Sequence, residues 1–320
     1  TGPYELHPEA HIMTSRERPD AVLQRAGHAD LGETQSGETY MVHLCGRPLP
    51  NRGRCTLGRE TAIQRMRWCD DGWLRTADGT GLPEAEVRAP ALPAHPFPPA
   101  PVREDFDGER LPDDFQWLRS PWPGELFSLT ARPGHLRLFG AETPGSLFRQ
   151  ALVARRQQSH CYSACAGLDF DPADFRQMAG LICYYSGSKY HYLCVSHDEG
   201  LGRHVRVMSC LPDAAQSDVF GPPMPLPAGV RVHLRVEVDY ERLWFAFRAG
   251  DGAWEWMPGP LDAGILSDEA GPQWNPNFTG AFVGMCCQDL AGTRIPADFD
   301  YFSYREREFL PDPKGGFEAI

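Results

Sequence analysis

The chain has 320 residues, of which 42% are hydrophobic and 23% charged, so it is long enough for roughly two globular domains. Its 32 glycines and 30 prolines favour short strands joined by turns and argue against a long helical bundle. The 31 basic and 43 acidic side chains give a net charge of −12, which repels phosphate backbones and anionic membranes. We therefore expect neither nucleic acid nor a membrane as a partner.

The ten cysteines lie mostly inside apolar, strand-like runs and lack the paired spacing of a tetrahedral zinc site. We interpret them as reduced, buried thiols, which favours a reducing compartment, and we expect a cytoplasmic location.

The first 88 residues contain strand-length runs at 40–45 and 61–68. The dipeptide Asp71-Gly72 follows the second run and is typical of a tight turn. We expect antiparallel hairpins here, in a sheet too small to cover its own edges. Because the chain opens at Thr1 without an initiator methionine, we expect an internal cut there, with the N-terminal remainder of a larger sheet assembly missing.

A proline-rich stretch at 89–101 (APALPAHPFPPAP) has six prolines among thirteen residues and no formal charge. Each proline ring fixes φ and removes an amide donor, so the stretch is predicted to be a semi-rigid extended linker. It divides the chain into domains at 1–88 and 102–320.

The second domain continues the β pattern. Apolar residues alternate with polar ones over 230–238, which predicts a strand with one wet face. Further strands are predicted at 147–155, 161–170, 179–186, 190–196, 203–210, 242–249, 280–288 and 298–304. So many short strands indicate a two-layer sandwich or jelly roll.

Two segments of the first domain carry candidate functional side chains, at 27–31 (GHADL) and 52–61 (RGRCTLGRET). His28 lies beside a strand, where a hydrogen-bonded structural role competes with a ligand role. Arg59 and Glu60 open the 61–68 strand, where a pair of this kind also fits an ion pair at the rim of a sheet. The residues alone leave both questions open.

The same segments resemble a known family. Stretches 4–8 (YELHP), 26–31 (AGHADL), 43–49 (HLCGRPL) and 57–64 (LGRETAIQ) are similar to the closing blades of family 43 glycoside hydrolases of the β-xylosidase branch. Stretches 105–107 (DFD), 115–119 (FQWLR) and 277–285 (NFTGAFVGM) resemble the C-terminal β-sandwich of that branch. The resemblance covers nearly the whole chain.

This resemblance implies an all-β chain: the closing segment of a five-bladed β-propeller, then a concanavalin-like β-sandwich. It implies part of an inverting, exo-acting β-1,4-xylosidase that removes terminal xylose from xylo-oligosaccharides, often with α-L-arabinofuranosidase activity. Inversion needs one carboxylate to activate water and a carboxylic acid to protonate the leaving oxygen. In the family these groups come from early blades, so Asp30 and Glu60 are not candidates. We expect no catalytic residue in this chain, and no activity from it alone.

Three residues match binding positions of the family. Arg59 corresponds to an arginine that reaches into the sugar pocket. His28 corresponds to a histidine near the propeller axis, which in some members helps to hold a divalent cation such as calcium. Phe278 corresponds to a sandwich aromatic that closes the pocket, although a phenylalanine of the core or of the packing between the domains is the alternative. No cofactor is required, and whether a metal binds near His28 stays open.

The expected partners are the xylo-oligosaccharide substrate and the missing N-terminal propeller segment, with homo-oligomer formation left open. The competing hypothesis is a non-catalytic module whose sandwich binds carbohydrate or mediates oligomerisation. Trp254 and Trp256 would then form a stacking platform for sugars.

Overall fold

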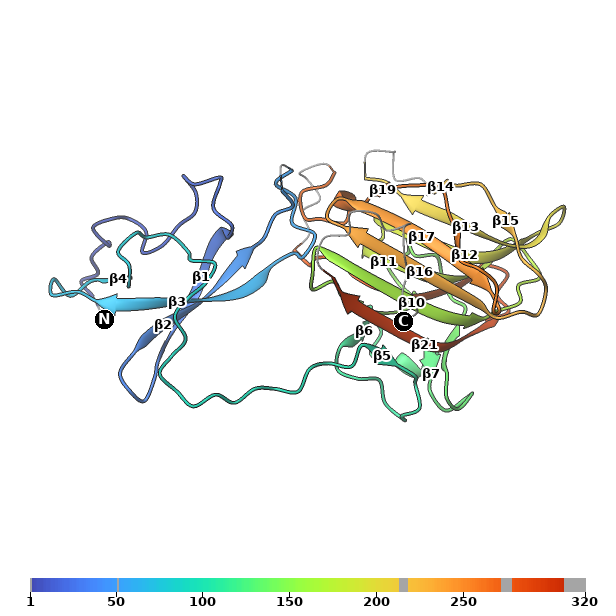
Figure 1. Cartoon of the computed structure of the whole chain (residues 1–320), viewed down its shortest axis with the longest axis horizontal. Coiled ribbons are helices and arrows are strands. Elements are labelled where there is room, and N and C mark those ends of the chain that lie inside the picture. Colours follow the sequence, from blue (N-terminus) through green and yellow to red (C-terminus); the bar gives the residue numbers. More distant parts are fainter. Residues whose placement is uncertain (1, 51, 213–217, 272–277, 308–320) are drawn as a thin grey trace.

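The computed structural model describes residues 2–50, 52–212, 218–271 and 278–307. Thr1, Asn277 and residues 308–320, which figure in the sequence-based predictions, lie outside these ranges. Two short 3-10 helices are present, η1 (Pro123–Glu125) and η2 (Ala263–Ile265), and the other regular elements are strands. The described part has no helix that is long and apolar enough to cross a membrane. Figure 1 shows a small sheet and a larger sandwich joined by an extended connector, so the predicted all-β class is confirmed.

The N-terminal sheet consists of β1 (Gln24–Glu33), β2 (Thr39–Gly46), β3 (Glu60–Trp68) and β4 (Leu74–Thr76) in that order. Every neighbouring pair is antiparallel. The predicted turn joins β3 to β4: the amide of Cys69 donates to the carbonyl of Trp73 at 2.9 Å, and Gly72 has φ +80°. Four antiparallel strands in chain order form one propeller blade.

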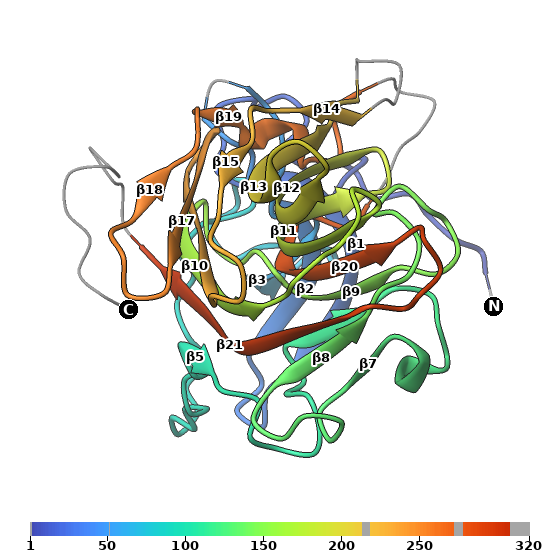
Figure 2. The ribbon, with the colours of Figure 1, turned by 90° about the vertical axis from the view of Figure 1, so that its right-hand side faces the viewer.

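The sandwich contains two sheets, which lie against each other when the molecule is viewed from the sandwich end (Figure 2). The first has the order β18-β17-β16-β10-β21-β8-β7, with β19 beside β17 and β5 beside β21. Its strands are β5 (Arg103–Glu104), β7 (Phe127–Ser128), β8 (Leu136–Phe139), β10 (Cys161–Asp169), β16 (Val232–Asp239), β17 (Arg242–Ala249), β18 (Glu255–Trp256), β19 (Leu261–Asp262) and β21 (Pro296–Glu306).

The second sheet has the order β14-β13-β12-β11-β20-β9-β6, with β15 beside β13. Its strands are β6 (Phe115–Trp117), β9 (Ala151–Arg156), β11 (Gln177–Ser186), β12 (Lys189–Asp198), β13 (Gly202–Cys210), β14 (Asp218–Phe220), β15 (Met224–Pro225) and β20 (Phe282–Asp289).

Strand β11 shows how the core is divided. Leu181 and Tyr185 belong to the main cluster between the two sheets, whereas Ile182 and Tyr184 belong to a second cluster on the other face of the same sheet. This follows from the two-residue period of a strand, because successive side chains point to opposite faces. Both faces of β11 are therefore apolar and buried, which makes it a rigid support for the residues at its ends.

Strand β16 differs from the prediction of one wet face. Its apolar side chains enter the main core as expected, but Arg235 and Glu237 on the opposite face are also buried. The guanidinium Nε of Arg235 donates to Glu237 Oε1 at 2.6 Å, and its Cζ lies 5.6 Å from the ring centroid of Trp254. Burial nevertheless raises the pKa of Glu237, because the ion pair only partly offsets the loss of water.

The strand predicted at 147–155 begins only at Ala151. Leu147 and Phe148 lie in the preceding loop and are 64% and 76% exposed. The hydroxyl of Ser146 accepts from the amide of Phe148 at 3.0 Å, a local turn that competes with strand pairing. From sequence alone, the apolar pair Leu147-Phe148 fits a strand, because the turn at Ser146 is not visible there. This explains why the predicted strand begins four residues too early.

The connector over 89–101 contains no strand and is tied to a domain at each end. On the N-terminal side, the hydroxyl of Tyr40 donates to the carbonyl of Arg88 at 3.0 Å, and the amide of Ala91 donates to Glu38 Oε2 at 2.8 Å. On the sandwich side, the amide of Tyr304 donates to the carbonyl of Val102 at 2.8 Å. The connector thus has a defined path between the two domains.

All ten cysteines are free thiols, and nine of them are buried, with Cys69 partly exposed. Burial raises the pKa of several of these thiols, to about 12 for Cys183 and Cys286. The predicted burial of the cysteines is therefore confirmed for all but Cys69.

His191 on β12 is a buried histidine held in its neutral form. Its Nδ1 lies 2.7 Å from the hydroxyl of Ser209, and its Nε2 lies 3.0 Å from the carbonyl of Asp262. A neutral ring with the proton on Nε2 donates to the carbonyl and accepts from the hydroxyl, so both nitrogens are satisfied. Burial lowers the pKa of His191 from its ordinary 6.5 to about 4.

This shift predicts a loss of stability in acid. Between pH 6.5 and about 4 the unfolded chain takes up a proton at His191 that the folded chain does not, so the free energy of unfolding falls as the pH falls through this window. The loss attributable to this residue reaches about 3 kcal/mol at the acid end. His191→Gln should flatten the pH dependence measured by urea unfolding at pH 7, 5.5 and 4.5. The same change at the exposed His95 is the control, and parallel curves for wild type and His191→Gln would contradict the prediction.

Candidate functional site

The candidate site lies where the loop between β2 and β3 meets the sandwich. At the close of this loop, Gly58 has φ +71° and packs on Gly280, which has φ +84°. A Cβ on Gly58 would lie 2.6 Å from the Cα of Gly280, and one on Gly280 would lie 2.7 Å from the carbonyl oxygen of Leu57. The amide of Ala281 also donates to the carbonyl of Thr56 at 2.7 Å. The two backbones meet at a distance that only glycine allows.

This contact brings Arg59 and Phe278 together from different domains. Arg59 directly follows Gly58, and Phe278 stands two residues before Gly280. The Cζ of Arg59 lies 5.1 Å from the ring centroid of Phe278, within cation–π range. The Phe278 side chain is 66% exposed and so does not belong to the sandwich core.

Arg59 is held by an acidic residue of the sandwich. Its Nη1 donates to Asp268 Oδ2 at 2.5 Å, and the two side chains are only 17% and 5% exposed. The second carboxylate oxygen of Asp268 accepts from the hydroxyl of Tyr185, at the end of β11. Arg59 is therefore part of a shielded polar network and not an ion pair on a wet rim.

The surroundings of Asp268 act on its pKa in both directions, and burial, the largest effect, leaves the pKa raised. Burial raises the pKa of its carboxyl, and the nearby Glu269 acts in the same direction. The Tyr185 hydrogen bond and the Arg59 charge act against this by stabilising the carboxylate. Burial also lowers the pKa of Lys189, whose Nζ donates to the carbonyl of Ser267 at 2.8 Å.

Further polar contacts join the same two segments. Arg52 donates to both oxygens of Asp262, at 2.6 and 3.0 Å, and Arg54 reaches that carboxylate at 3.4 Å. Glu269 accepts from the amide of Cys55 at 2.6 Å and pairs with Arg25. The domains are thus held by several contacts in parallel, of which Arg59–Asp268 is one.

His28 lies on β1 at a distortion of the sheet. The register between β1 and β2 shifts between Gly27 and Asp30, and His28, inside this bulge, has φ +49°. Its side chain is exposed. Because Gly27 and Thr61 both pair with Leu44, the backbone near His28 lies two strands, or roughly 10 Å, from the start of β3. Bulges of this kind re-aim side chains at active sites.

The predicted metal role of His28 depends on the oxygen ligands around it. Calcium takes six to eight oxygen ligands, and no group of three or more His, Cys, Asp or Glu side chains suited to a metal occurs in the described ranges. Calcium also binds backbone carbonyl and water oxygens, so the metal role of His28 stays a prediction.

Glu60 and Asp30 are the carboxylates nearest in sequence to Arg59 and His28, and both form hydrogen bonds with other groups. Glu60 accepts from Arg47 Nη2 at 2.7 Å and from its Nε at 2.9 Å. Asp30 accepts from the amide of Leu31 at 2.8 Å, as an exposed local turn. Neither takes part in the Arg59 network.

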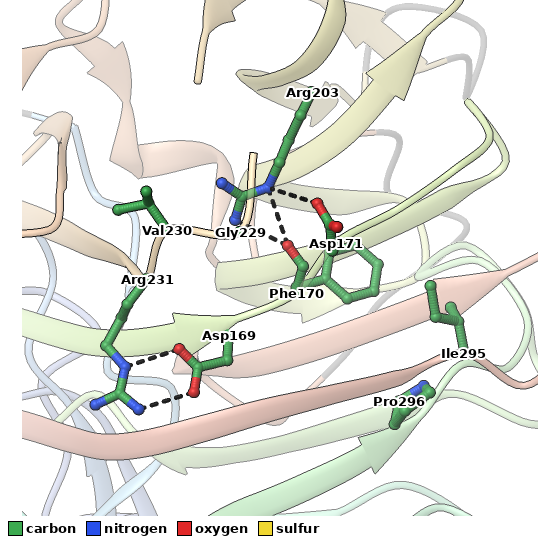
Figure 3. A pocket seen from close by; sticks show the side chains of 9 residues that line it. All are labelled: Asp169, Phe170, Asp171, Arg203, Gly229, Val230, Arg231, Ile295 and Pro296. Carbon is green, nitrogen blue, oxygen red and sulfur yellow. Dashed lines mark hydrogen bonds and ion pairs between the residues drawn. The ribbon is translucent and has the colours of Figure 1, made fainter. Parts of the chain in front are cut away.

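Figure 3 shows a cavity of the sandwich at the ends of β10, β13, β16 and β21. Its volume is about 360 Å³, and neither Arg59 nor Phe278 is among its lining residues. Its charged groups satisfy one another or the backbone: Arg231 pairs with Asp169 at 2.8 Å, and Arg203 donates to the carbonyl of Phe170 at 2.8 and 3.0 Å. Phe170 is itself buried, so no exposed aromatic face is offered to a sugar.

The sequence-based interpretation missed Asp268, Glu269, Asp262 and Tyr185. The acids lie at the end of β19 and in the segment that follows it, more than 200 positions from their arginine partners, and no spacing rule links residues so far apart. Tyr185 reads as an ordinary residue of an apolar strand. From residue 101 onward the chain has 30 acidic and 20 basic side chains, and this acidic excess does not single out a position.

Comparison with known proteins identifies two family models and several relatives that the chain matches. Residues 1–74 match the model of glycosyl hydrolases family 43, and residues 103–305 match the β-xylosidase C-terminal concanavalin A-like domain. The β-xylosidase of Bacillus subtilis (strain 168) is 40% identical over 316 residues, covering 96% of this chain and 58% of that protein. The xylosidase/arabinosidase 43B of Humicola insolens is 44% identical, covering 95% of this chain and 57% of its own length.

Among solved structures, the xylan β-1,4-xylosidase of Bacillus halodurans C-125 superimposes with a TM-score of 0.91 at 43% identity, covering 95% of this chain and 58% of that one. The chain thus spans little more than half the length of these relatives. The predicted fold class, a propeller segment followed by a concanavalin-like sandwich, is confirmed. The chain belongs to glycoside hydrolase family 43, where it corresponds to the C-terminal portion of the β-xylosidase branch.

Proposed function

We propose that this chain is the C-terminal part of an inverting, exo-acting β-1,4-xylosidase that removes terminal xylose from xylo-oligosaccharides. The single observation that carries the proposal is the meeting of Arg59 and Phe278 from two domains, with a 5.1 Å separation between guanidinium carbon and ring centroid. An α-L-arabinofuranosidase activity is proposed beside it, supported by the name of the Humicola relative.

In this proposal the chain binds and encloses the sugar, while the acid and the base come from a preceding propeller segment. Inverting hydrolysis needs two carboxyl groups far enough apart to seat a water molecule at the anomeric carbon. Arg59 uses Nη1 for Asp268, and its Nε and Nη2 donate no hydrogen bond to the described residues. Those donors suit sugar hydroxyls, and the permanent charge keeps a nearby carboxylate ionised.

Phe278 supplies the wall of the pocket. An exposed aromatic ring offers an apolar face to the C–H surface of a sugar ring. A pocket closed on one side by such a ring accepts a chain end, whereas an internal xylan unit needs a cleft open at both ends. This supports exo action.

The N-terminal sheet also supports a preceding segment as its partner. Val42 and Ile63 face each other across β2 and β3 and are 45% and 42% exposed. A cross-strand apolar pair exposed to this extent fits the packing face of one blade against the next.

The competing role as a sugar-binding module receives no support from Trp254, one of the two aromatic residues expected to serve it. Trp254 is only partly exposed, and two arginines lie against it: the Cζ atoms of Arg235 and Arg248 are 5.6 and 5.2 Å from ring centroids of this indole. With two arginines against it and only part of its surface exposed, this indole offers a sugar less free surface than Phe278, which is 66% exposed and has one arginine over it.

The first test compares this chain with the complete protein. Residues 1–320 alone should give no measurable turnover of an aryl β-xyloside, whereas the chain completed by its propeller segment should be active. Intact-mass analysis verifies that no full-length enzyme is present. Turnover that persists in such a sample would overturn the division of roles.

Replacing Arg59 by Ala in the complete enzyme should lower kcat/KM at least about tenfold. The change removes a charge and a hydrogen-bonding fork from a shielded site, a loss on the order of 2 to 5 kcal/mol of transition-state stabilisation. Arg18→Ala, which breaks the exposed pair with Asp20, is the matched control and should have no effect. Wild-type kinetics for Arg59→Ala would show that it does not act on substrate.

Phe278→Ala should weaken substrate binding with little change in stability. Loss of an aromatic packing face is worth roughly 1 to 3 kcal/mol, and the exposed ring contributes little to the core. Phe245→Ala, in the core, should instead cost about 3 to 5 kcal/mol of stability. Xyloside kinetics and thermal unfolding on both variants separate the cases. A large fall in Tm with an unchanged KM for Phe278→Ala would contradict its role in the pocket.

A further inference from the structure

The contacts of Arg59 raise the question of what fixes its direction. A long arginine side chain loses considerable rotamer freedom when it is held in one orientation, so a site that relies on it needs an opposing group. Within the described part of the chain, Asp268 is the residue with which Arg59 forms a hydrogen bond. At 17% and 5% exposure the pair is shielded from water, which distinguishes it from ordinary surface ion pairs.

Asp268 is itself held in place from the sandwich core. Tyr185, at the end of the doubly buried β11, donates its hydroxyl proton to Oδ1 and leaves Oδ2 for Arg59. The residue before Asp268 is fixed as well, because buried Lys189 on β12 donates to the carbonyl of Ser267. The Nζ of Lys189 also lies 4.5 Å from the ring centroid of Tyr185. Two adjacent core strands thus determine where the carboxylate stands.

Together the carboxylate and the aromatic ring constrain the guanidinium in two different ways. Asp268 holds one Nη group at the edge of the plane, and the ring of Phe278 lies within cation–π distance of the Cζ. A planar group that is held at one edge and stacked near a ring keeps its remaining N–H donors in a defined direction.

We infer that Asp268 is a positioning residue through which the sandwich orients Arg59 toward the sugar. The inference rests on the proposed function, and it gives the sandwich a second task besides closing the pocket.

Docking of the two domains does not depend on this pair alone. The Arg52–Asp262 pair, the Cys55 amide on Glu269, and the backbone bond from Ala281 to Thr56 all join the same surfaces. Loss of the Asp268 charge therefore leaves the domains together while it releases Arg59, and the two effects are separable.

The test uses Asp268→Asn in the complete enzyme, with Asp262→Asn as the matched control. The amide at 268 still accepts from Tyr185 but no longer offers Arg59 a charged acceptor. We expect kcat/KM to fall at least tenfold in Asp268→Asn and to stay within about twofold of wild type in Asp262→Asn. Because Asp268 acts through Arg59, adding Asp268→Asn to Arg59→Ala should cause no further loss. Full activity of Asp268→Asn, or losses that multiply in the double variant, would overturn the inference.

A second variant and a structural measurement keep the test independent of folding and of the substrate. Tyr185→Phe removes one bond to Asp268 and should lower kcat/KM in the same direction but by less. A crystal structure of the complete Asp268→Asn enzyme should show the Arg59 guanidinium displaced, with Asp262→Asn unchanged. If the complete protein proves inactive on xylosides while the guanidinium moves, the proposed function fails and the positioning role stands. An undisplaced guanidinium refutes the positioning role.

Discussion

The close packing of the Gly58 and Gly280 backbones is the constraint on which the rest of the arrangement depends. Both residues adopt positive φ, and neither leaves room for a Cβ, so the two loops approach more closely than side chains permit. Arg59 follows Gly58 directly, and Phe278 stands two residues before Gly280, so this contact brings both side chains together. The site is consequently assembled by main-chain geometry first, and the polar contacts around it act on side chains already brought within reach.

The fold was largely predictable from local signals. The alternation over 230–238 identified the core-facing residues of β16, and Asp71-Gly72 identified the turn before β4. These signals succeed because strand period and turn chemistry are properties of neighbouring residues. The two errors have the same origin. The burial of Arg235 depends on its contacts with Trp254 and Glu237. The exclusion of Leu147 from a strand depends on a competing turn at Ser146.

The site was predictable only in part. Arg59, His28 and Phe278 came from family resemblance, and the structure brings two of them together while His28 sits in a bulge two strands away. Asp268 and Tyr185 could not be found this way, because their importance arises from a contact across the domain boundary. A residue whose role is to hold another side chain carries no chemical signature of its own. Its identification requires the three-dimensional arrangement.

The connector over 89–101 has a mechanical consequence. Its ends are tied to the blade at Ala91 and to the sandwich at Val102, and in Figure 1 it runs along the edge of the molecule opposite the docked loop. A proline-rich segment of this kind is an extended, semi-rigid spacer, so it acts as a strap between the two domains. Strap and docked loop thus attach the sandwich at two points and form a closed frame. A domain attached at two points cannot swing about one hinge, so Phe278 keeps its position relative to the blade.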